Sequence, residues 1–265
     1  MENNNYPFEL KAYDFSFKIF KEIIFALNAF FIGFWLGVLK REHYHLVDSI
    51  YYNQTEMYRD ENYNKRGLWD WEEKVLAQYF QQCHNLLVVA AGGGREVLAL
   101  CKRGYEVDGF ECNANLLKFA NNLIKQEEFA SHIKLAPRDQ CPDSQKEYDG
   151  LIVGWGAYML IQGKERRIEF LRQLRTQAKK NSPVLLSFFC YSETTGGRDF
   201  KAIAMIGNAF RRLLGRECLE VGDNLAPNYV HYFTKDEIAS ELQAGGFELK
   251  IYCTNQYGHA VGIAV

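Results

Sequence analysis

A short apolar run that ends in three glycines is the feature that most constrains the fold. Residues 86–90 are continuously apolar, glycines 92–94 follow, and residues 95–103 have the pattern of a helix. Such a run is typical of a strand that is buried on both faces. Glycines let a ligand approach the backbone where a Cβ would clash, and the start of a helix offers unpaired N–H groups. The pattern predicts a ligand-binding strand–turn–helix, with a purely structural turn as the alternative.

Strands and helices alternate after this turn. Further strands are predicted at residues 106–110, 133–136, 148–154 and 184–190, with helices at residues 114–126 and 165–179. This alternation indicates βαβ units and a parallel sheet. Residues 192–232 break it with a glycine-rich turn, a helix near residues 200–214 and an irregular stretch up to residue 233. A helix that begins after Thr234 and two strands at residues 247–252 and 260–265 then predict a closing hairpin.

The N-terminal part is aromatic and follows a different pattern. Residues 1–14 are polar and expected to be loose, and residues 15–82 look helical. Between residues 23 and 39 only Asn28 is strongly polar, but a membrane span needs about 20 apolar residues. We expect a buried or cap-forming helix. A peripheral membrane helix, a homo-oligomer contact and a true span remain open.

Composition narrows the classes of partner. The formal net charge is −2, and nucleic-acid binders usually carry a basic excess, so no nucleic-acid partner is predicted. The seven cysteines are scattered without a C-x-x-C pair, which predicts no metal site and a reducing, cytoplasmic location. Aromatic residues make up 15% of the chain, enough to line a pocket for an apolar or planar ligand as well as the core.

An acid after the second strand favours an adenosine-type cofactor. Glu111 lies seventeen positions after Gly94, and an acid about 20 residues beyond a glycine turn can accept hydrogen bonds from ribose hydroxyls. A solvent-facing strand end is the alternative reading. The dinucleotide fingerprint G-x-G-x-x-G fails because Val97 occupies its sixth position, and G-K-[ST] is absent. These failures argue against NAD and ATP and favour S-adenosylmethionine (AdoMet).

On these residues the chain resembles the class I AdoMet-dependent methyltransferases, of the small-molecule type, over about residues 80–265. The family motif V-L-D-x-G-x-G-x-G is matched at Gly92 and Gly94, and YDGLIVGWGAY looks like the fourth motif. The chain departs at Ala90, where glycine is usual, and at Val88, where the family usually has an acid. The resemblance implies a Rossmann-like α/β fold, a mostly parallel seven-stranded sheet with an antiparallel C-terminal strand.

The resemblance also implies a domain organisation and a set of site residues. Residues 1–79 would be an N-terminal extension or cap, and residues 80–265 the AdoMet-binding domain with a cap inserted at about 192–232. Glu111 would meet the ribose and Asp139 the adenine amino group, although Asp139 could simply be a turn acid. The full cofactor set is Ala91, Gly92, Gly93, Gly94, Glu111, Cys112, Asn113, Asp139, Gln140, Gly154 and Trp155. The acceptor would meet Arg66, Trp69, Trp155 and Tyr158.

Methyl transfer is an in-line displacement that the enzyme promotes by alignment and exclusion of water, and an oxygen acceptor also needs a base. His231 is the first candidate base, with a structural histidine as the alternative. Tyr229 and Tyr158 follow, then Glu193 and His259. We predict methyl transfer to oxygen or nitrogen of a small, hydrophobic specialised metabolite. A non-catalytic binding protein or subunit, or a peptide or protein methyltransferase, are the alternatives.

Overall fold

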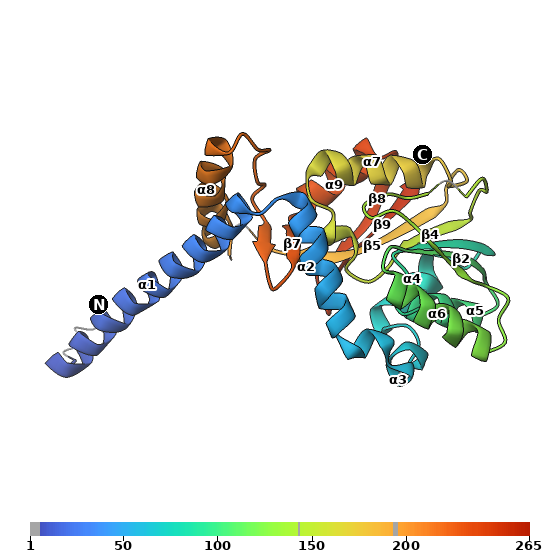
Figure 1. Cartoon of the computed structure of the whole chain (residues 1–265), viewed down its shortest axis with the longest axis horizontal. Helices are drawn as coiled ribbons and strands as arrows, with labels where there is room; N and C mark the ends of the chain where they lie inside the picture. The colour runs from blue at the N-terminus through green and yellow to red at the C-terminus, as the bar shows by residue number, and fades with distance from the viewer. Residues whose placement is uncertain (1–5, 143, 193–195) are drawn as a thin grey trace. The chain divides into compact units, whose positions relative to one another are not determined.

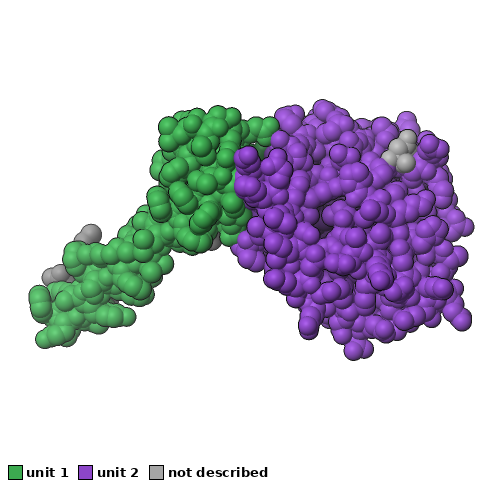
Figure 2. Space-filling model, viewed as in Figure 1, with its two compact units in different colours: residues 1–39, 193–225 green, residues 40–192, 226–265 purple. Residues whose placement is uncertain are grey.

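The computed structural model describes residues 6–142, 144–192 and 196–265 (Figure 1). The chain divides into two compact units, shown in green and purple in Figure 2. The smaller comprises residues 1–39 and 193–225, and the larger comprises residues 40–192 and 226–265. Residues 40–79 therefore belong to the same unit as the predicted cofactor-binding domain.

The larger unit contains most of the regular structure. Its helices are α2 (Arg41–Gln54), η1 (Glu56–Arg59), α3 (Glu61–Lys65), α4 (Asp70–Tyr79), α5 (Arg95–Cys101), α6 (Ala114–Gln126), η2 (Tyr158–Leu160), α7 (Lys164–Arg175) and α9 (Lys235–Ala244). Its strands are β1 (Asn85–Val89), β2 (Glu106–Glu111), β3 (Ile133–Leu135), β4 (Gly150–Val153), β5 (Pro183–Cys190), β7 (Tyr229–Phe233), β8 (Phe247–Cys253) and β9 (Gly258–Ala264).

The sheet has the predicted arrangement. Strands β3, β2, β1, β4 and β5 lie in that order and pair in parallel. Strand β9 pairs antiparallel with β5, and β8 pairs antiparallel with β9. The predicted mostly parallel sheet with an antiparallel C-terminal strand is confirmed.

The prediction of an irregular stretch up to residue 233 was wrong at its end, because residues 229–233 form β7. This strand pairs in parallel with the end of β5, in the register Phe189 to Tyr232. The pairing of β5 with β4 involves Val184 and Leu185 near the start of β5. The free end of β5 offers backbone groups that a later segment can satisfy, and no local sequence pattern reveals such a partner.

Helices cover both faces of the sheet. Alternate residues of β1 point to opposite sides, as expected of a strand. Leu87 and Val89 pack in the cluster that contains residues of α7 and α9. Leu86 and Val88 pack in the cluster that contains residues of α4, α5 and α6. The result is a three-layer α/β/α arrangement (Figure 1), which explains why β1 is continuously apolar.

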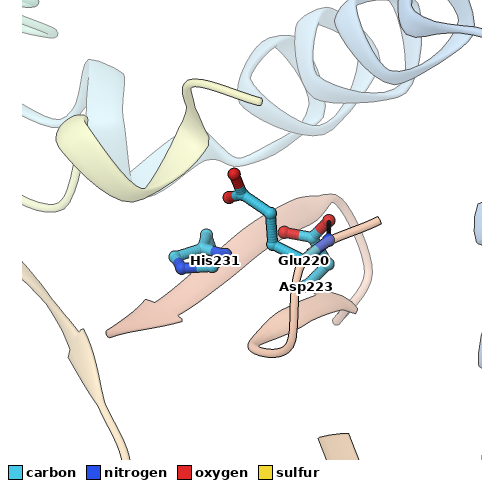
Figure 3. Close-up of side chains that lie close together, drawn as sticks. All are labelled: Glu220, Asp223 and His231. Carbon is cyan, nitrogen blue, oxygen red and sulfur yellow. Dashed lines mark hydrogen bonds between the residues drawn. The ribbon is translucent and has the colours of Figure 1, made fainter. Parts of the chain in front are cut away.

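The smaller unit is built on two helices, α1 (Phe8–Val38) and α8 (Gly197–Leu213), with the short strand β6 (Asp223–Leu225). Glycines let the helices approach closely: a Cβ on Gly33 would lie 2.8 Å from the Ile203 carbonyl oxygen. The buried Arg211 side chain donates from Nε to the Leu36 carbonyl (3.0 Å). Before β6, the Glu220 N–H donates to the Asp223 carboxylate at 3.0 Å (Figure 3).

Helix α1 begins earlier than the sequence predicted and exposes much apolar surface. Residues 8–14 are helical rather than loose, and Lys18 supports this first part through an ion pair with Asp14, one turn earlier. The exposed large side chains are Phe8, Leu10, Tyr13, Phe15, Phe17, Ile19, Phe20, Ile23, Ile24, Leu27, Phe30, Phe31 and Trp35. Among the described residues, α1 is long and apolar enough to span a membrane, by length and composition. The core helix of a soluble protein or a signal sequence can meet the same criterion.

Candidate functional site

The candidate site lies at the carboxyl ends of β1, β2 and β4. Strand β1 lies between β2 and β4, so the strand order reverses here, and open parallel sheets bind ligands at such a point. A cavity of about 320 Å³ lies there. It is lined by Ala90, Ala91, Gly92 and Gly93 after β1, by Glu111, Cys112 and Asn113 at the end of β2, by Trp155, Ala157 and Leu160 after β4, and by His45, Ser49, Tyr52, Tyr58, Tyr63 and Asn64.

The glycine turn forms one wall of this cavity. Gly92 has a φ of +56°, and a Cβ at this position would meet no atom within 4 Å, so its backbone is open to a ligand. Gly93 is covered instead: a Cβ there would lie 2.2 Å from the Tyr58 carbonyl oxygen and 2.6 Å from Asn64 Oδ1. The turn therefore accepts a ligand at Gly92 while the segment between α2 and α3 closes over Gly93.

Glu111 joins the turn after β1 to the turn after β2. Its carboxylate accepts the N–H groups of Gly92 and Asn113, each at 2.7 Å. The side chain is buried, and this burial raises the pKa of Glu111 although the two N–H groups oppose the shift. A carboxylate has about four acceptor positions, so Glu111 can accept further hydrogen bonds from a ligand in the cavity.

A smaller cavity of about 70 Å³ adjoins the first and shares with it Ala90, Glu111, Cys112, Arg138, Ala157 and Leu160. Its other walls are mainly apolar and include Phe110, Pro137 and Phe170, together with Asp139 and Gln140. Glu111 therefore lines both cavities, and the smaller of the two is mainly apolar.

Asp139 forms ion pairs with residues of α2. Its Oδ2 accepts from Arg41 (2.8 Å) and lies 3.0 Å from His45 Nε2. Burial acts to raise the pKa of Asp139, but the bonds from His45 and Arg41 hold it below its usual value. On the same helix, the buried Asp48 pairs with Arg138 and accepts from Asn228. These contacts fasten α2 to the loop after β3, beside the smaller cavity.

A second buried ionic cluster lies at the other end of the main cavity. The Arg95 guanidinium donates to both carboxylate oxygens of Glu72 (2.7 and 2.8 Å) and to Glu96 Oε1 (2.8 Å). Glu96 Oε1 also accepts the Trp155 N–H at 3.1 Å. Arg95 and Glu96 line the cavity, so the cluster joins the start of α5 to the loop after β4.

Aromatic side chains form the remaining wall. The rings of Tyr52 and Tyr58 lie 5.1 Å apart, and the ring of Trp155 lies 5.1 Å from Tyr257 and 6.0 Å from Trp69. Burial raises the pKa of Tyr58 to about 12 and the pKa of Tyr52 above its usual value. Both hydroxyls are therefore neutral near pH 7 and can donate hydrogen bonds to a ligand.

The predicted cofactor residues separate into three groups. The main cavity is lined by Ala91, Gly92, Gly93, Glu111, Cys112, Asn113 and Trp155, and the smaller one by Glu111, Cys112, Asp139 and Gln140. Gly94 and Gly154 line neither and allow close packing instead. A Cβ on Gly154 would lie 2.0 Å from the Ala90 carbonyl oxygen, and Gly94 begins α5 with a φ of +93° beside Ala120.

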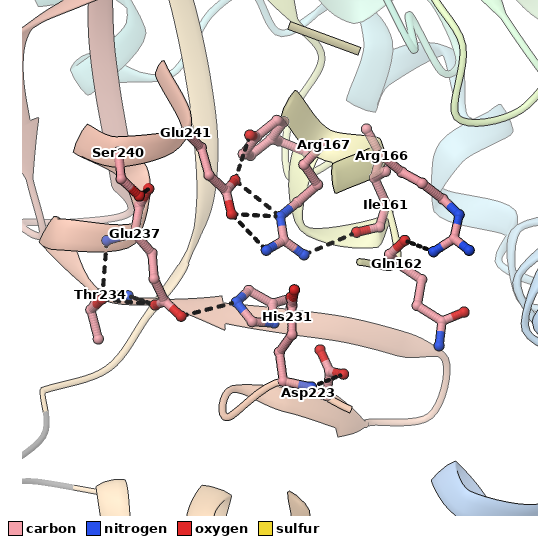
Figure 4. A network of polar contacts seen from close by, with 12 residues as sticks. Ile161, Gln162, Arg166, Arg167, Asp223, His231, Thr234, Glu237, Ser240 and Glu241 are labelled. Atoms are coloured by element: carbon pink, nitrogen blue, oxygen red, sulfur yellow. Dashed lines mark hydrogen bonds and ion pairs between the residues drawn. The ribbon is translucent and has the colours of Figure 1, made fainter. Parts of the chain in front are cut away.

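Only some of the predicted acceptor residues line the same space. The Arg66 guanidinium lies 3.9 Å from the centre of the Trp69 ring, and both line an open depression with Trp155. Tyr158 is fully buried in the sheet core, where its hydroxyl donates to Glu241 at 2.7 Å. Glu241 also accepts from Arg167 (2.6 Å), as Figure 4 shows. Trp155 thus contacts both spaces, whereas Tyr158 lines neither.

The predicted base residues lie outside the linings of these cavities. His231 is buried on β7, with its ring 4.5 Å from that of Phe233 and its Nε2 3.7 Å from Glu237 Oε1 (Figure 4). Tyr229 stacks on Tyr44. His259 Nδ1 lies 2.7 Å from the Tyr257 carbonyl oxygen. Glu193 lies outside the described residues, and the catalytic roles of the others stay predictions.

Sequence reasoning missed the residues that α2 contributes. Arg41, His45, Asp48 and Tyr52 are spaced by four, three and four positions, which places them on one face of a helix. That polar face was the available signal, because a polar stripe on an aromatic-rich helix suggests a contact with a polar site. Arg95 and Glu96 were also missed, although they directly follow the glycine turn.

No protein-family model and no curated protein matches the chain. Solved structures do match its fold. A SAM-dependent methyltransferase from Methanosarcina mazei superposes with a TM-score of 0.60 at 15% identity, covering 75% of this chain and 99% of that one. CalS10, an amino pentose methyltransferase from Micromonospora echinaspora, gives 0.54 at 11% identity, covering 86% and 98%. KedS8, a sugar N-methyltransferase from Streptoalloteichus, gives 0.55 at 13% identity, covering 81% and 91%.

The chain has the class I methyltransferase fold. The similar structures cover most of both chains, and the sheet is mostly parallel with an antiparallel C-terminal strand, as the sequence resemblance implied. In this fold the cavity beside Gly92 and Glu111 occupies the ligand-binding crevice at the reversal of strand order.

Proposed function

We propose that the protein is an AdoMet-dependent methyltransferase that acts on oxygen or nitrogen of a small acceptor. The observation that carries the proposal is the pair of adjoining cavities that share Glu111, the larger of which is lined by the open backbone of Gly92. The neighbours of the same fold, which are SAM-dependent methyltransferases, support it.

The residues present fit AdoMet in three regions. The smaller, mainly apolar cavity, with Phe110, Pro137 and Phe170, suits a flat adenine ring. Glu111 has acceptor positions left for ribose hydroxyls. The open backbone at Gly92 and the neighbouring Arg95–Glu96 pair suit the methionine end. When bound, AdoMet would supply an electrophilic methyl group, and the chain would bind it, orient the acceptor and exclude water.

The aromatic wall supports an acceptor with an apolar or planar face. Tyr52, Tyr58 and Trp155 line the cavity next to the loop after β4, and the neutral tyrosine hydroxyls can orient a polar group of the acceptor. CalS10 is an amino pentose methyltransferase and KedS8 a sugar N-methyltransferase, which supports a small polar acceptor. We therefore include in the proposal a specialised metabolite that presents both an apolar face and a nucleophilic oxygen or amine.

All seven cysteines are free, in keeping with a cytoplasmic location.

The alternative of a non-catalytic binding protein predicts a closed glycine turn. Gly93 is covered by Tyr58 and Asn64, but Gly92 is open to a cavity of about 320 Å³. This opening favours a protein that binds a cofactor. A peptide or protein methyltransferase would need the same cofactor site. An activity screen that offers both peptides and small molecules distinguishes the two classes of acceptor.

Calorimetric titration of the purified protein with AdoMet and, separately, with NADH tests the proposal. We expect micromolar AdoMet binding and no NADH binding, followed by transfer of a labelled methyl group to a member of a panel of aromatic alcohols, amines and amino sugars. A folded sample that binds no AdoMet would overturn the proposed cofactor. AdoMet binding without transfer to any small molecule, but with labelling of peptides, would overturn the proposed acceptor class.

A further inference from the structure

The Arg95 cluster has an unbalanced charge. Arg95 pairs with two carboxylates, those of Glu72 and Glu96, through N–O distances of 2.7 to 2.8 Å. The exposed fractions of the three residues are 3%, 4% and 5%. One guanidinium and two ionised carboxylates carry a net charge of −1. A buried group of charges that is not neutral is costly unless a further partner compensates it.

The cluster has no second cation in an ion pair with it. Among the described residues, only Arg95 forms ion pairs with Glu72 or Glu96, and Arg66 stacks instead on the Trp69 ring, 3.9 Å from its centre. The other contacts are to neutral groups, namely the Gly67 carbonyl and the N–H groups of Trp69 and Trp155. Burial raises the pKa of Glu72 even though Arg95 opposes the shift, as an excess of negative charge would.

The cluster lies where its charge can act on a ligand in the main cavity. Arg95 and Glu96 line the main cavity, and Glu96 is bonded to the first residue of the loop after β4, Trp155. The same cavity contains Gly92 and the aromatic wall, between which the methionine end and the acceptor would lie in the proposed function. A net negative charge at this wall attracts a cation that enters the cavity and has little effect on a neutral molecule of the same shape.

We propose that the Arg95–Glu72–Glu96 cluster makes the cavity selective for the cationic sulfonium form of the cofactor over its neutral thioether product. This inference rests on the proposed function. In the transfer, the acceptor's lone pair forms a bond to the methyl carbon as the carbon–sulfur bond breaks. The electron pair of that bond stays on sulfur, which becomes the neutral thioether of S-adenosylhomocysteine (AdoHcy), and the acceptor releases its proton to solvent.

The change of charge gives the cluster a role in turnover. Before transfer, the positive sulfonium compensates the net charge of the cluster, and after transfer the compensation is lost. The product is therefore held less firmly than the substrate form of the cofactor. Selectivity of this kind helps AdoMet to displace AdoHcy and limits inhibition by the product.

Calorimetry with AdoMet and AdoHcy on the wild type, Glu96→Gln and Glu72→Gln tests the inference. Each variant removes one negative charge at constant shape, and Glu72 does not line the cavity, so its loss leaves the ligand contacts intact. We expect the ratio of the AdoHcy to the AdoMet dissociation constant to fall about tenfold in each variant. The control is Glu248→Gln on β8, an exposed acid paired with Lys250, which should leave the ratio unchanged.

A wild-type measurement keeps the test independent of how the variants fold. An analogue that carries an amine-bearing carbon in place of the sulfonium is cationic but lacks the methyl group, and it should bind like AdoMet rather than like AdoHcy. An analogue that binds only as well as AdoHcy would overturn the inference, as would equal losses of affinity for AdoMet and AdoHcy in the glutamine variants. If the folded wild type binds none of the three ligands, the proposed cofactor is wrong and the inference falls with it.

Discussion

Replacing Glu111 by alanine removes a carboxylate that lines both cavities. In the protein this carboxylate accepts two backbone N–H groups at 2.7 Å, and in the proposed complex it also accepts from ribose hydroxyls. A hydrogen bond to a charged group contributes about 1.5–3 kcal/mol. We therefore expect Glu111→Ala to weaken AdoMet binding by about 2 kcal/mol, or roughly thirtyfold. Titration calorimetry at neutral pH measures this change directly.

The variant also changes the free protein, so stability must be measured beside affinity. Loss of the carboxylate leaves the N–H groups of Gly92 and Asn113 to water, and we expect the free energy of unfolding to fall by about 1–2 kcal/mol. Glu111→Gln is the matched control, because it keeps one acceptor oxygen and should lose less affinity. An AdoMet affinity equal to that of the wild type, in folded Glu111→Ala, would refute the assignment of Glu111 to the ribose.

Three further predictions follow from the structure. Because burial raises the pKa of Glu111, AdoMet affinity should decrease as the pH is lowered through that pKa and the carboxylate is protonated. Calorimetry at several pH values should find this dependence reduced in Glu111→Gln. An identical pH profile in both proteins would contradict the prediction. Arg167→Met leaves the buried Glu241 without its cation and should lower the free energy of unfolding by about 3–5 kcal/mol, measured by urea denaturation; a loss no larger than that of an exposed ion pair would contradict the pairing. His231→Ala tests whether His231 acts as the base that the sequence predicted or only packs in the core. Because the ring is buried against Phe233, we expect the free energy of unfolding to fall by about 2 kcal/mol and the kcat of the folded enzyme to stay unchanged. A large loss of kcat would support the catalytic role.

The departure from the family motif at Val88 shows how sequence and structure complement each other. The family usually has an acid at this position, and valine cannot make the contact of an acid. In the structure Val88 is fully buried in β1. Besides Glu111, the acid that lines the main cavity is Glu96, on α5, and its partner Arg95 is held by Glu72, on α4. Glu72 is distant in sequence from the glycine turn, so no motif that spans the turn includes it.

Several site predictions needed only local information. Gly92 and Glu111 were identified because a buried strand, a turn and a helix each leave a pattern within about ten residues. The roles of Gly93 and Tyr158 could not be identified in this way. Gly93 is required by the approach of Tyr58 and Asn64, and Tyr158 is turned into the core by its bond to Glu241. Both depend on segments far away in the chain.

The sequence by itself therefore determined the parallel sheet, its closing hairpin and the position of the glycine turn. These features follow from the period and length of apolar runs, which reflect burial on one or two faces of each element. The tertiary structure alone decided that α2 places His45 in the main cavity and pairs Arg41 and Asp48 with the loop after β3, and that His231 is buried outside the cavity lining. The physical reason is that a polar side chain finds its partner across the fold, through packing between segments that no local pattern encodes.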